Sequence, residues 1–176
     1  MALARPPQSA TYDLPARQFA RLARPLHLRR GGVIEQPVVA YESWGQLNAA
    51  RDNAVLLFTG LSPSAHAASS PADPKPGWWE SMIGAGRPID TSRYFVVCVN
   101  SLGSPFGSSG PSSTDPRSGR PYGISFPEIT VEDIATAGHE VVRSLGIERV
   151  AAVVGPSLGG MTVLAYCALF PGEAES

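Results

Sequence analysis

The stretch GPSLG (155–159) sets a serine between two glycines, directly after the apolar run 149–154. A second apolar stretch, 161–170, follows and predicts a helix. G-x-S-x-G between a buried strand and a helix is typical of a nucleophile elbow, a turn so tight that its glycine positions cannot carry a Cβ. Ser157 is therefore the candidate nucleophile, and the Leu158 N–H would point at the oxyanion formed by its attack. The alternative is a glycine-rich turn that only packs closely or holds a phosphate.

Two further apolar runs, 54–59 (AVLLFT) and 94–99 (YFVVCV), predict strands buried on both faces. A helix is predicted over 130–145, where Thr130 and Asp133 have the spacing of a capping box. Strands of this kind alternating with helices predict an α/β fold with a mostly parallel, doubly wound sheet.

The earlier part of the chain is less regular. The run 38–45 (VVAYESWG) alternates and predicts a strand, with 26–36 (LHLRRGGVIEQ) as its hairpin partner around two glycines. Residues 1–24 are predicted to form a flexible leader. Residues 25–176 are predicted to be the N-terminal portion of a single domain.

Composition excludes several classes of protein. The net charge is −1, with scattered basic residues, which argues against a nucleic-acid partner. No apolar run is long enough for a membrane span, and the N-terminus lacks the apolar core of a secretory signal, so a cytoplasmic protein is expected. Cys98 and Cys167 are predicted to be reduced, buried core residues, and no metal site is expected.

A serine nucleophile needs a second oxyanion donor and a base. The loop after 54–59 leaves the same sheet edge, and the Leu61 N–H is the candidate donor. The base and its acid normally follow the serine in the chain. All three histidines precede it: His27 in an early strand, His66 near the site, and His139 on the predicted solvent-exposed face of a helix. We therefore expect the chain to be truncated after the nucleophile helix, with the lid, the later strands, the acid and the histidine absent.

Longer motifs carry a resemblance over about residues 39–171. They are YESWGQLNAARDNAVLLFTGLSPSAHA (41–67), WWE (78–80), GAGRPIDT (84–91), NSLG (100–103), GRPYG (119–123) and FPEITVED (126–133). Together they resemble the homoserine O-acyltransferases of the α/β-hydrolase superfamily.

This resemblance implies an α/β-hydrolase fold and a CoA-dependent O-acyltransferase. Ser157 would carry the acyl group between the two half-reactions, with Leu61 and Leu158 as oxyanion-hole donors. The implied co-substrate is succinyl-CoA or acetyl-CoA, with no bound cofactor. The acceptor would be L-serine or L-homoserine, in cysteine or methionine biosynthesis, and the protein would form a homodimer.

Two departures from the family pattern bear on specificity. The family elbow reads GGSMGG, and its oxyanion loop reads LTGDSH. The residues that differ or surround the differences, and are predicted to set specificity, are Gly60, Ser62, Pro63, Ser64, His66 and Pro156. They favour the branch that succinylates serine, and the succinyl carboxylate would need an arginine or several N–H donors. The candidate arginines are Arg87, Arg117 and Arg120.

Two other functions stay open: an esterase or thioesterase of the same fold, and a non-catalytic truncated paralogue that acts as a binding module. The glycine-rich stretch 101–127 is predicted to be an ordered loop that borders the active site. Its predicted apolar anchors are Leu102, Phe106, Tyr122, Ile124 and Phe126.

Overall fold

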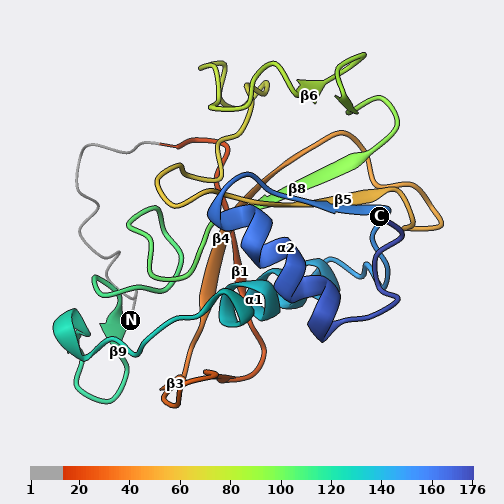
Figure 1. Cartoon of the computed structure of the whole chain (residues 1–176). Helices are drawn as coiled ribbons and strands as arrows, with labels where there is room; N and C mark the ends of the chain where they lie inside the picture. The colour runs from red at the N-terminus through yellow and green to blue at the C-terminus, as the bar shows by residue number, and fades with distance from the viewer. Residues whose placement is uncertain (1–13) are drawn as a thin grey trace.

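The computed structural model describes residues 14–176, and its centre is a five-stranded sheet in the order β1-β4-β8-β5-β11 (Figure 1). The bounds are β1 Gln18–Arg21, β4 Val38–Trp44, β8 Phe95–Val99, β5 Ala54–Phe58 and β11 Ala152–Val154. Strand β4 is antiparallel to both of its neighbours, whereas β8, β5 and β11 are parallel to one another. Four of the five strands therefore run the same way, and the expected mostly parallel sheet is confirmed.

The central strands bury both faces, as their continuous apolar sequences predict. Every residue of β5 is buried. Leu56 and Phe58 belong to the core beneath the helices, whereas Val55 and Leu57 belong to a second core on the other face. Alternate residues of one strand thus fill two separate cores.

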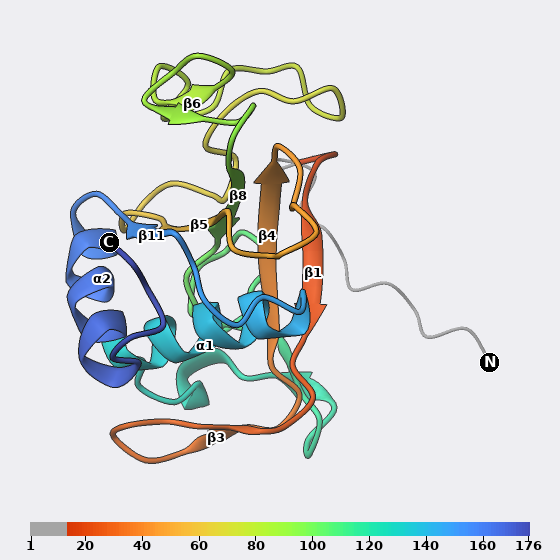
Figure 2. The same cartoon turned by 90° about the vertical axis from the view of Figure 1, so that its right-hand side faces the viewer.

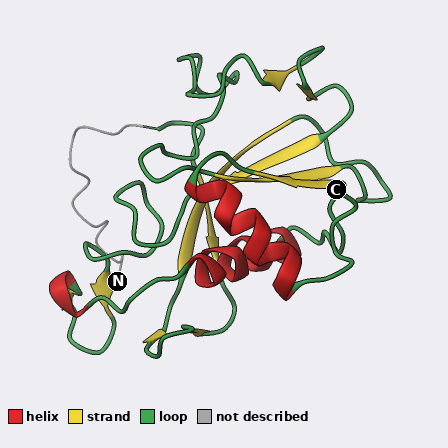
Figure 3. Ribbon diagram, viewed as in Figure 1, coloured by secondary structure: helices red, strands yellow, loops and turns green. Residues whose placement is uncertain are grey.

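Both helices lie on one face of the sheet and pack against each other (Figures 2 and 3). Helix α1 (Val131–Ser144) begins at Thr130, which forms the predicted capping box with Asp133. It approaches the sheet closely at Gly138, where an added Cβ would lie 2.4 Å from the Phe58 ring. Helix α2 (Leu158–Leu169) begins directly after the elbow serine.

The other face is covered by the segment 60–94, which contains no helix. Its regular elements are the paired two-residue strands β6 (Ile83–Gly84) and β7 (Ile89–Asp90). Trp78 and Trp79, whose ring centroids are 5.3 Å apart, pack against this core. Within the described residues, the second layer predicted for a doubly wound sheet is thus irregular chain.

Two predictions for the early chain are wrong. Residues 18–21 form β1, which pairs with β4, so the predicted leader 1–24 contributes an edge strand. Residues 1–13 lie outside the described residues. The stretch 26–36 does form a hairpin, from β2 (Leu26–His27) and β3 (Val33–Ile34), but these strands pair with each other and not with β4.

The glycine-rich stretch 101–127 is ordered and includes the hairpin β9 (Thr114–Asp115) and β10 (Arg120–Pro121) and a short 3-10 helix, Gly123–Ser125. Leu102 and Tyr122 are buried as predicted, but Ile124 is fully exposed and is not an anchor. The loop is fixed to β4 because the hydroxyls of Ser108 and Ser109 accept hydrogen bonds from strand N–H groups.

Helix α2 is apolar on all sides, yet only one of its sides is buried. Met161 is 54% and Leu164 is 72% exposed, and Cys167 is exposed, which corrects the prediction that it lies in the core. Both cysteines are free thiols. The last residues, 173–176, return beside β11, where Val150 and Val153 donate N–H bonds to them. No helix among the described residues is long and apolar enough to cross a membrane.

Candidate active site

Ser157 occupies the turn between β11 and α2, and its backbone is strained. Its φ of 54° and ψ of −122° fall in a region that residues with a Cβ seldom adopt. An added Cβ on Gly155 would lie 2.6 Å from the Gly159 backbone, and one on Gly159 would lie 2.4 Å from the Phe58 carbonyl oxygen. The two glycines therefore permit the turn, and the turn exposes the serine side chain.

The loop after β5 lies against this elbow. An added Cβ on Gly60 would be 3.8 Å from the Pro156 carbonyl oxygen. Leu61 follows and is 76% exposed. Neither the Leu61 N–H nor the Leu158 N–H donates to an acceptor within residues 14–176. Both amides are free to bind an oxyanion, and their assignment as the donors stays a prediction.

The residues predicted to set specificity belong to the elbow and this loop. Gly60 is buried, Ser62 is exposed, and Pro63, Ser64 and Pro156 are half-buried. His66 is only 7% exposed.

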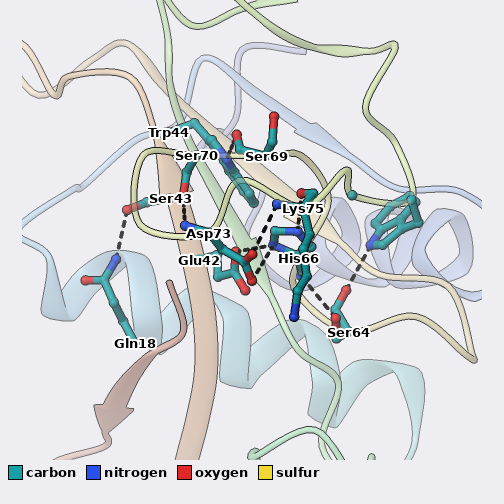
Figure 4. Close-up of polar contacts among 12 residues, drawn as sticks. Gln18, Glu42, Ser43, Trp44, Ser64, His66, Ser69, Ser70, Asp73 and Lys75 are labelled. Atoms are coloured by element: carbon teal, nitrogen blue, oxygen red, sulfur yellow. Dashed lines mark hydrogen bonds and ion pairs between the residues drawn. The ribbon is translucent and has the colours of Figure 1, made fainter. Parts of the chain in front are cut away.

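The His66 ring is engaged inside the protein. Its Nδ1 lies 2.9 Å from Glu42 Oε2, and its Nε2 lies 2.8 Å from the Lys75 carbonyl oxygen (Figure 4). With both ring nitrogens bonded, the ring is not free to bind a substrate or to act as a base. This placement argues against direct contact as the way in which His66 would set specificity, and the specificity assignment of the other loop residues stays a prediction.

His139 is not solvated, which corrects another prediction. Its side chain is 12% exposed, its Nε2 lies 2.8 Å from Glu173 Oε2, and its ring stacks on Phe170 with centroids 3.9 Å apart. The histidine ties the segment after α2 to α1. His27 lies on the exposed side of β2.

Comparison with known proteins supports this architecture. A family model described as alpha/beta hydrolase fold matches residues 53–174. The chain belongs to this family. The expected α/β-hydrolase fold is thereby confirmed.

Two curated relatives of this α/β hydrolase are acyltransferases by name. An L-serine/homoserine O-acetyltransferase of Streptomyces lavendulae is 59% identical over 92% of this chain and 43% of its own length. A serine O-succinyltransferase of Litchfieldella anticariensis is 57% identical over 89% of this chain and 43% of its own length. The chain therefore spans less than half the length of these relatives. The resemblance to the homoserine O-acyltransferases that the sequence motifs indicated is thereby confirmed.

Solved structures of similar shape include both a transferase and an esterase. A homoserine O-acetyltransferase from Bacillus anthracis is 32% identical, with a TM-score of 0.81, over 92% of this chain and 46% of that one. The esterase E22 is 35% identical, with a TM-score of 0.82, over 90% of this chain and 45% of that one. The fold alone thus does not separate transfer from hydrolysis.

The acid and histidine of an α/β hydrolase follow its serine. Residues 158–176 of this chain contain Glu173 and Glu175 and no histidine. Glu173 is already bonded to His139. Neither Glu173 nor Glu175 forms a hydrogen bond or ion pair with Ser157 within residues 14–176.

Two of the three candidate arginines of this α/β hydrolase are paired within their own segments. Arg87 Nη1 lies 3.0 Å from Glu80 Oε1. Arg117 Nε lies 3.3 Å from Asp115 Oδ1. Arg120 lies in the exposed β9–β10 hairpin. The geometry selects none of them as the partner of a succinyl carboxylate.

Two buried acidic residues of this α/β hydrolase, Glu42 and Asp73, were not predicted from the sequence. Glu42 is 0% and Asp73 is 1% exposed, and both flank the His66 ring. A signal for Glu42 was present: in the predicted strand 38–45 it shares a face with Ala40 and Trp44, so alternation places a carboxyl group in the core.

A hollow of about 410 Å³ in this α/β hydrolase lies away from the elbow. Its lining includes Trp44, Ser69 and Ile83. Trp44 ends β4 and pairs with Val96 near the start of β8. The hollow therefore lies at the N-terminal end of the parallel strands, whereas Ser157 follows the C-terminal end of β11. The site is therefore assigned from the elbow geometry and not from this hollow.

Proposed function

We propose that this chain supplies the nucleophile and the oxyanion hole of a CoA-dependent O-acyltransferase. The observation that carries the chemistry is the strained, exposed Ser157, and the Leu61 and Leu158 N–H groups, which donate to no acceptor among the described residues, support it. The names of the relatives that are 57–59% identical support acyl transfer to serine or homoserine.

The proposed reaction has two half-reactions. The Ser157 hydroxyl loses its proton to a base and attacks the thioester carbonyl carbon, and the Leu61 and Leu158 amides hold the oxyanion. The C–S bond breaks, CoA leaves as the thiol after taking the proton back, and an acyl ester remains on Ser157. The acceptor hydroxyl then attacks the ester carbonyl carbon and gives its proton to the base. The bond between the acyl carbon and Ser157 Oγ breaks, Oγ takes the proton from the base, and the acylated acceptor leaves. The base and its acid belong, in this proposal, to the part of the fold that has no counterpart in residues 1–176.

Succinyl is the proposed acyl group and L-serine the proposed acceptor. The support is the departure of Pro156 and of the loop 60–66 from the acetyl-transferring pattern, together with a relative named serine O-succinyltransferase. A role in cysteine or methionine biosynthesis, a cytoplasmic location and a homodimeric assembly belong to the same proposal.

An esterase is the second candidate. The observation that favours it is the TM-score of 0.82 to esterase E22, because the same elbow serves hydrolysis when water reaches the acyl-enzyme.

The test uses the natural gene product that contains this sequence. It is incubated with succinyl-CoA or acetyl-CoA, each with L-serine, L-homoserine or no acceptor, and both thiol release and the intact mass are followed. We expect an acyl adduct on the peptide that carries Ser157, and thiol turnover only when an amino acid is present. Ser157→Ala should abolish the adduct, whereas Ser118→Ala, in an exposed hairpin, should not.

The remaining outcomes discriminate the alternatives. Rapid thiol release without an acceptor would establish the hydrolase. No adduct with either thioester, in a folded protein, would favour a non-catalytic binding module and overturn the proposal.

A further inference from the structure

A buried ion pair joins the loop after β5 to strand β4 (Figure 4). Glu42 is 0% exposed and pairs in register with Cys98 of β8, so its side chain lies on the face that segment 60–94 covers. His66 belongs to that segment and places Nδ1 2.9 Å from Glu42 Oε2. Burying a carboxyl group costs free energy unless a partner compensates for its lost hydration, and His66 is that partner.

The second ring nitrogen decides the protonation of the pair. His66 Nε2 faces the Lys75 carbonyl oxygen, which can only accept, so Nε2 carries a hydrogen. Ionised Glu42 is also an acceptor, and His66 then donates from both nitrogens as an imidazolium. Burial alone lowers the pKa of His66, but its hydrogen bonds to Glu42 and Lys75, with nearby negative charge, outweigh burial and raise the pKa above the usual 6.5.

The other groups around the pair support this state. Asp73 Oδ2 lies 4.0 Å from His66 Nδ1 and adds a second negative charge. Burial raises the pKa of the Cys98 thiol well above its ordinary value, so that group stays neutral. The pKa of Glu42 is raised, chiefly by burial and further by the charge of Asp73, and the bond to His66, its charge and that of Arg17 offset this rise only in part. Two carboxyl groups thus flank one imidazolium.

This pair fixes one end of the oxyanion loop. At the other end, the Phe58 and Thr59 carbonyl oxygens pack against Gly159 of the elbow, where an added Cβ would lie 2.4 and 2.9 Å from them. Between the two ends, the Ser64 carbonyl oxygen accepts a hydrogen bond of 2.9 Å from Trp78 Nε1. The stretch around Leu61 is therefore a short exposed span between two fixed points.

We propose that Glu42 and His66 are positioning residues: their ion pair holds the loop 60–66, and with it the Leu61 N–H, in place beside Ser157. Neither side chain touches the reacting atoms. The consequence for acyl transfer rests on the proposed function, whereas the holding of the loop does not.

The experiment compares Glu42→Gln with Glu173→Gln in the natural gene product. Glu173→Gln is the matched control because it removes the charge from a second histidine–glutamate hydrogen bond, that of His139 with Glu173. Amide hydrogen exchange is followed by mass spectrometry across a pH series, and the histidine rings are titrated by NMR. In Glu42→Gln we expect the hydrogen-bonded amides at this fixed end of the loop, those of His66, Ala67 and Trp78, to exchange about tenfold faster, the order expected for a charge-assisted hydrogen bond. We also expect the His66 titration, and with it the loss of protection, to move to lower pH.

The control should leave the exchange of the His66, Ala67 and Trp78 amides unchanged and accelerate exchange only in the segment after α2. Unchanged exchange of the His66, Ala67 and Trp78 amides in Glu42→Gln would overturn the inference. Equal acceleration of these amides and of those in α1 would also overturn it, because the pair would then support the core in general. If the loop loosens but wild-type Ser157 accepts no acyl group, the positioning stands and the proposed function fails. If Ser157 is acylated, Glu42→Gln should lower kcat more than it changes KM.

A second pair of variants covers the case in which Glu42→Gln does not fold. The amide nitrogen of an asparagine side chain takes the place of Nδ1, and that of a glutamine takes the place of Nε2. We expect His66→Asn to protect the loop better than His66→Gln, since it retains the donor to Glu42. Equal protection in the two variants would overturn the inference.

Discussion

Ser157, the proposed nucleophile, carries a conformational cost. Its φ of 54° with ψ of −122° is a backbone state that glycine adopts freely and that costs other residues about 1–3 kcal/mol. The tight contacts of Gly155 and Gly159 hold the serine in that state. A residue that serves only the fold would avoid this cost, which is why the strain itself supports a nucleophile at this position.

The strain predicts an inverted preference between alanine and glycine. The free energy of unfolding should be about 1–2 kcal/mol higher for Ser157→Gly than for Ser157→Ala, because glycine adopts the positive φ without strain. At Thr136, in the middle of α1, the order should reverse, with alanine more stable by about 1 kcal/mol. Urea denaturation of the four variants measures both differences. The same order at both positions would show that Ser157 is unstrained.

Single residues also mark the limit of prediction from sequence. The elbow was predictable because strand, glycines, serine and helix are contiguous in the chain. The ion pair of Glu42 with His66 was not, because it joins residues 24 positions apart through a loop whose path no local pattern specifies. His139 was placed on the wrong side for the same reason: its partner Glu173 lies 34 residues away.

At the scale of elements, α1 is the unit that ties the early chain to the sheet. Asp133 accepts from the Thr130 N–H at 2.8 Å and from the Arg29 N–H at 2.8 Å. One carboxylate therefore caps α1 and binds the β2–β3 hairpin. The same helix meets β5 at Gly138, where only the missing Cβ leaves room for the Phe58 ring.

Asp133→Ala should destabilise the protein by about 2–3 kcal/mol. The change removes the cap and leaves the Thr130 and Arg29 N–H groups without their acceptor. Glu140→Ala, at an exposed position of the same helix, should cost less than about 0.5 kcal/mol. Thermal or urea unfolding provides the comparison, and similar losses in the two variants would refute the double role of Asp133.

Elements whose signals are local were predicted well. The runs at β5, β8 and β11 are continuous and apolar, and α1 carries its own capping box. The pairing of β1 with β4 was missed because a strand of four residues, Gln18–Arg21, is too short to show a period. The cover of the second face was missed because it is built from turns and tryptophans, not from a helix.

The whole molecule is one sheet with two unlike covers. On one face, helices bury their apolar side against alternate strand residues. On the other face, the segment 60–94 has no helical hydrogen bonds, so side-chain packing and side-chain hydrogen bonds stabilise its conformation. Glu80 is central here: it accepts from the Ser69 N–H, the Ser69 hydroxyl, the Gly77 N–H and Arg87.

This network predicts a dependence of overall stability on acid. The backbone N–H of Ser69, then that of Gly77, then Arg87 and the Ser69 hydroxyl lower the pKa of Glu80 from 4.5 to about 2. A carboxyl group whose pKa is lower in the folded state stabilises the fold above its unfolded value. That contribution is present above about pH 4.5 and is lost as the pH falls toward 2.

Glu80→Gln should therefore flatten the fall of the unfolding free energy between pH 4.5 and 2, and lower stability at neutral pH, since glutamine carries no charge to titrate. Glu128→Gln is the control, because its ion pair with Arg30 at 3.6 Å is exposed on both sides and should contribute little. Urea unfolding at a series of pH values gives both curves. If the unfolding free energy of Glu80→Gln falls as steeply between pH 4.5 and 2 as that of the wild type, other carboxylates determine the stability in acid. The helix-free cover would then be held mainly by the packing of Trp78 and Trp79.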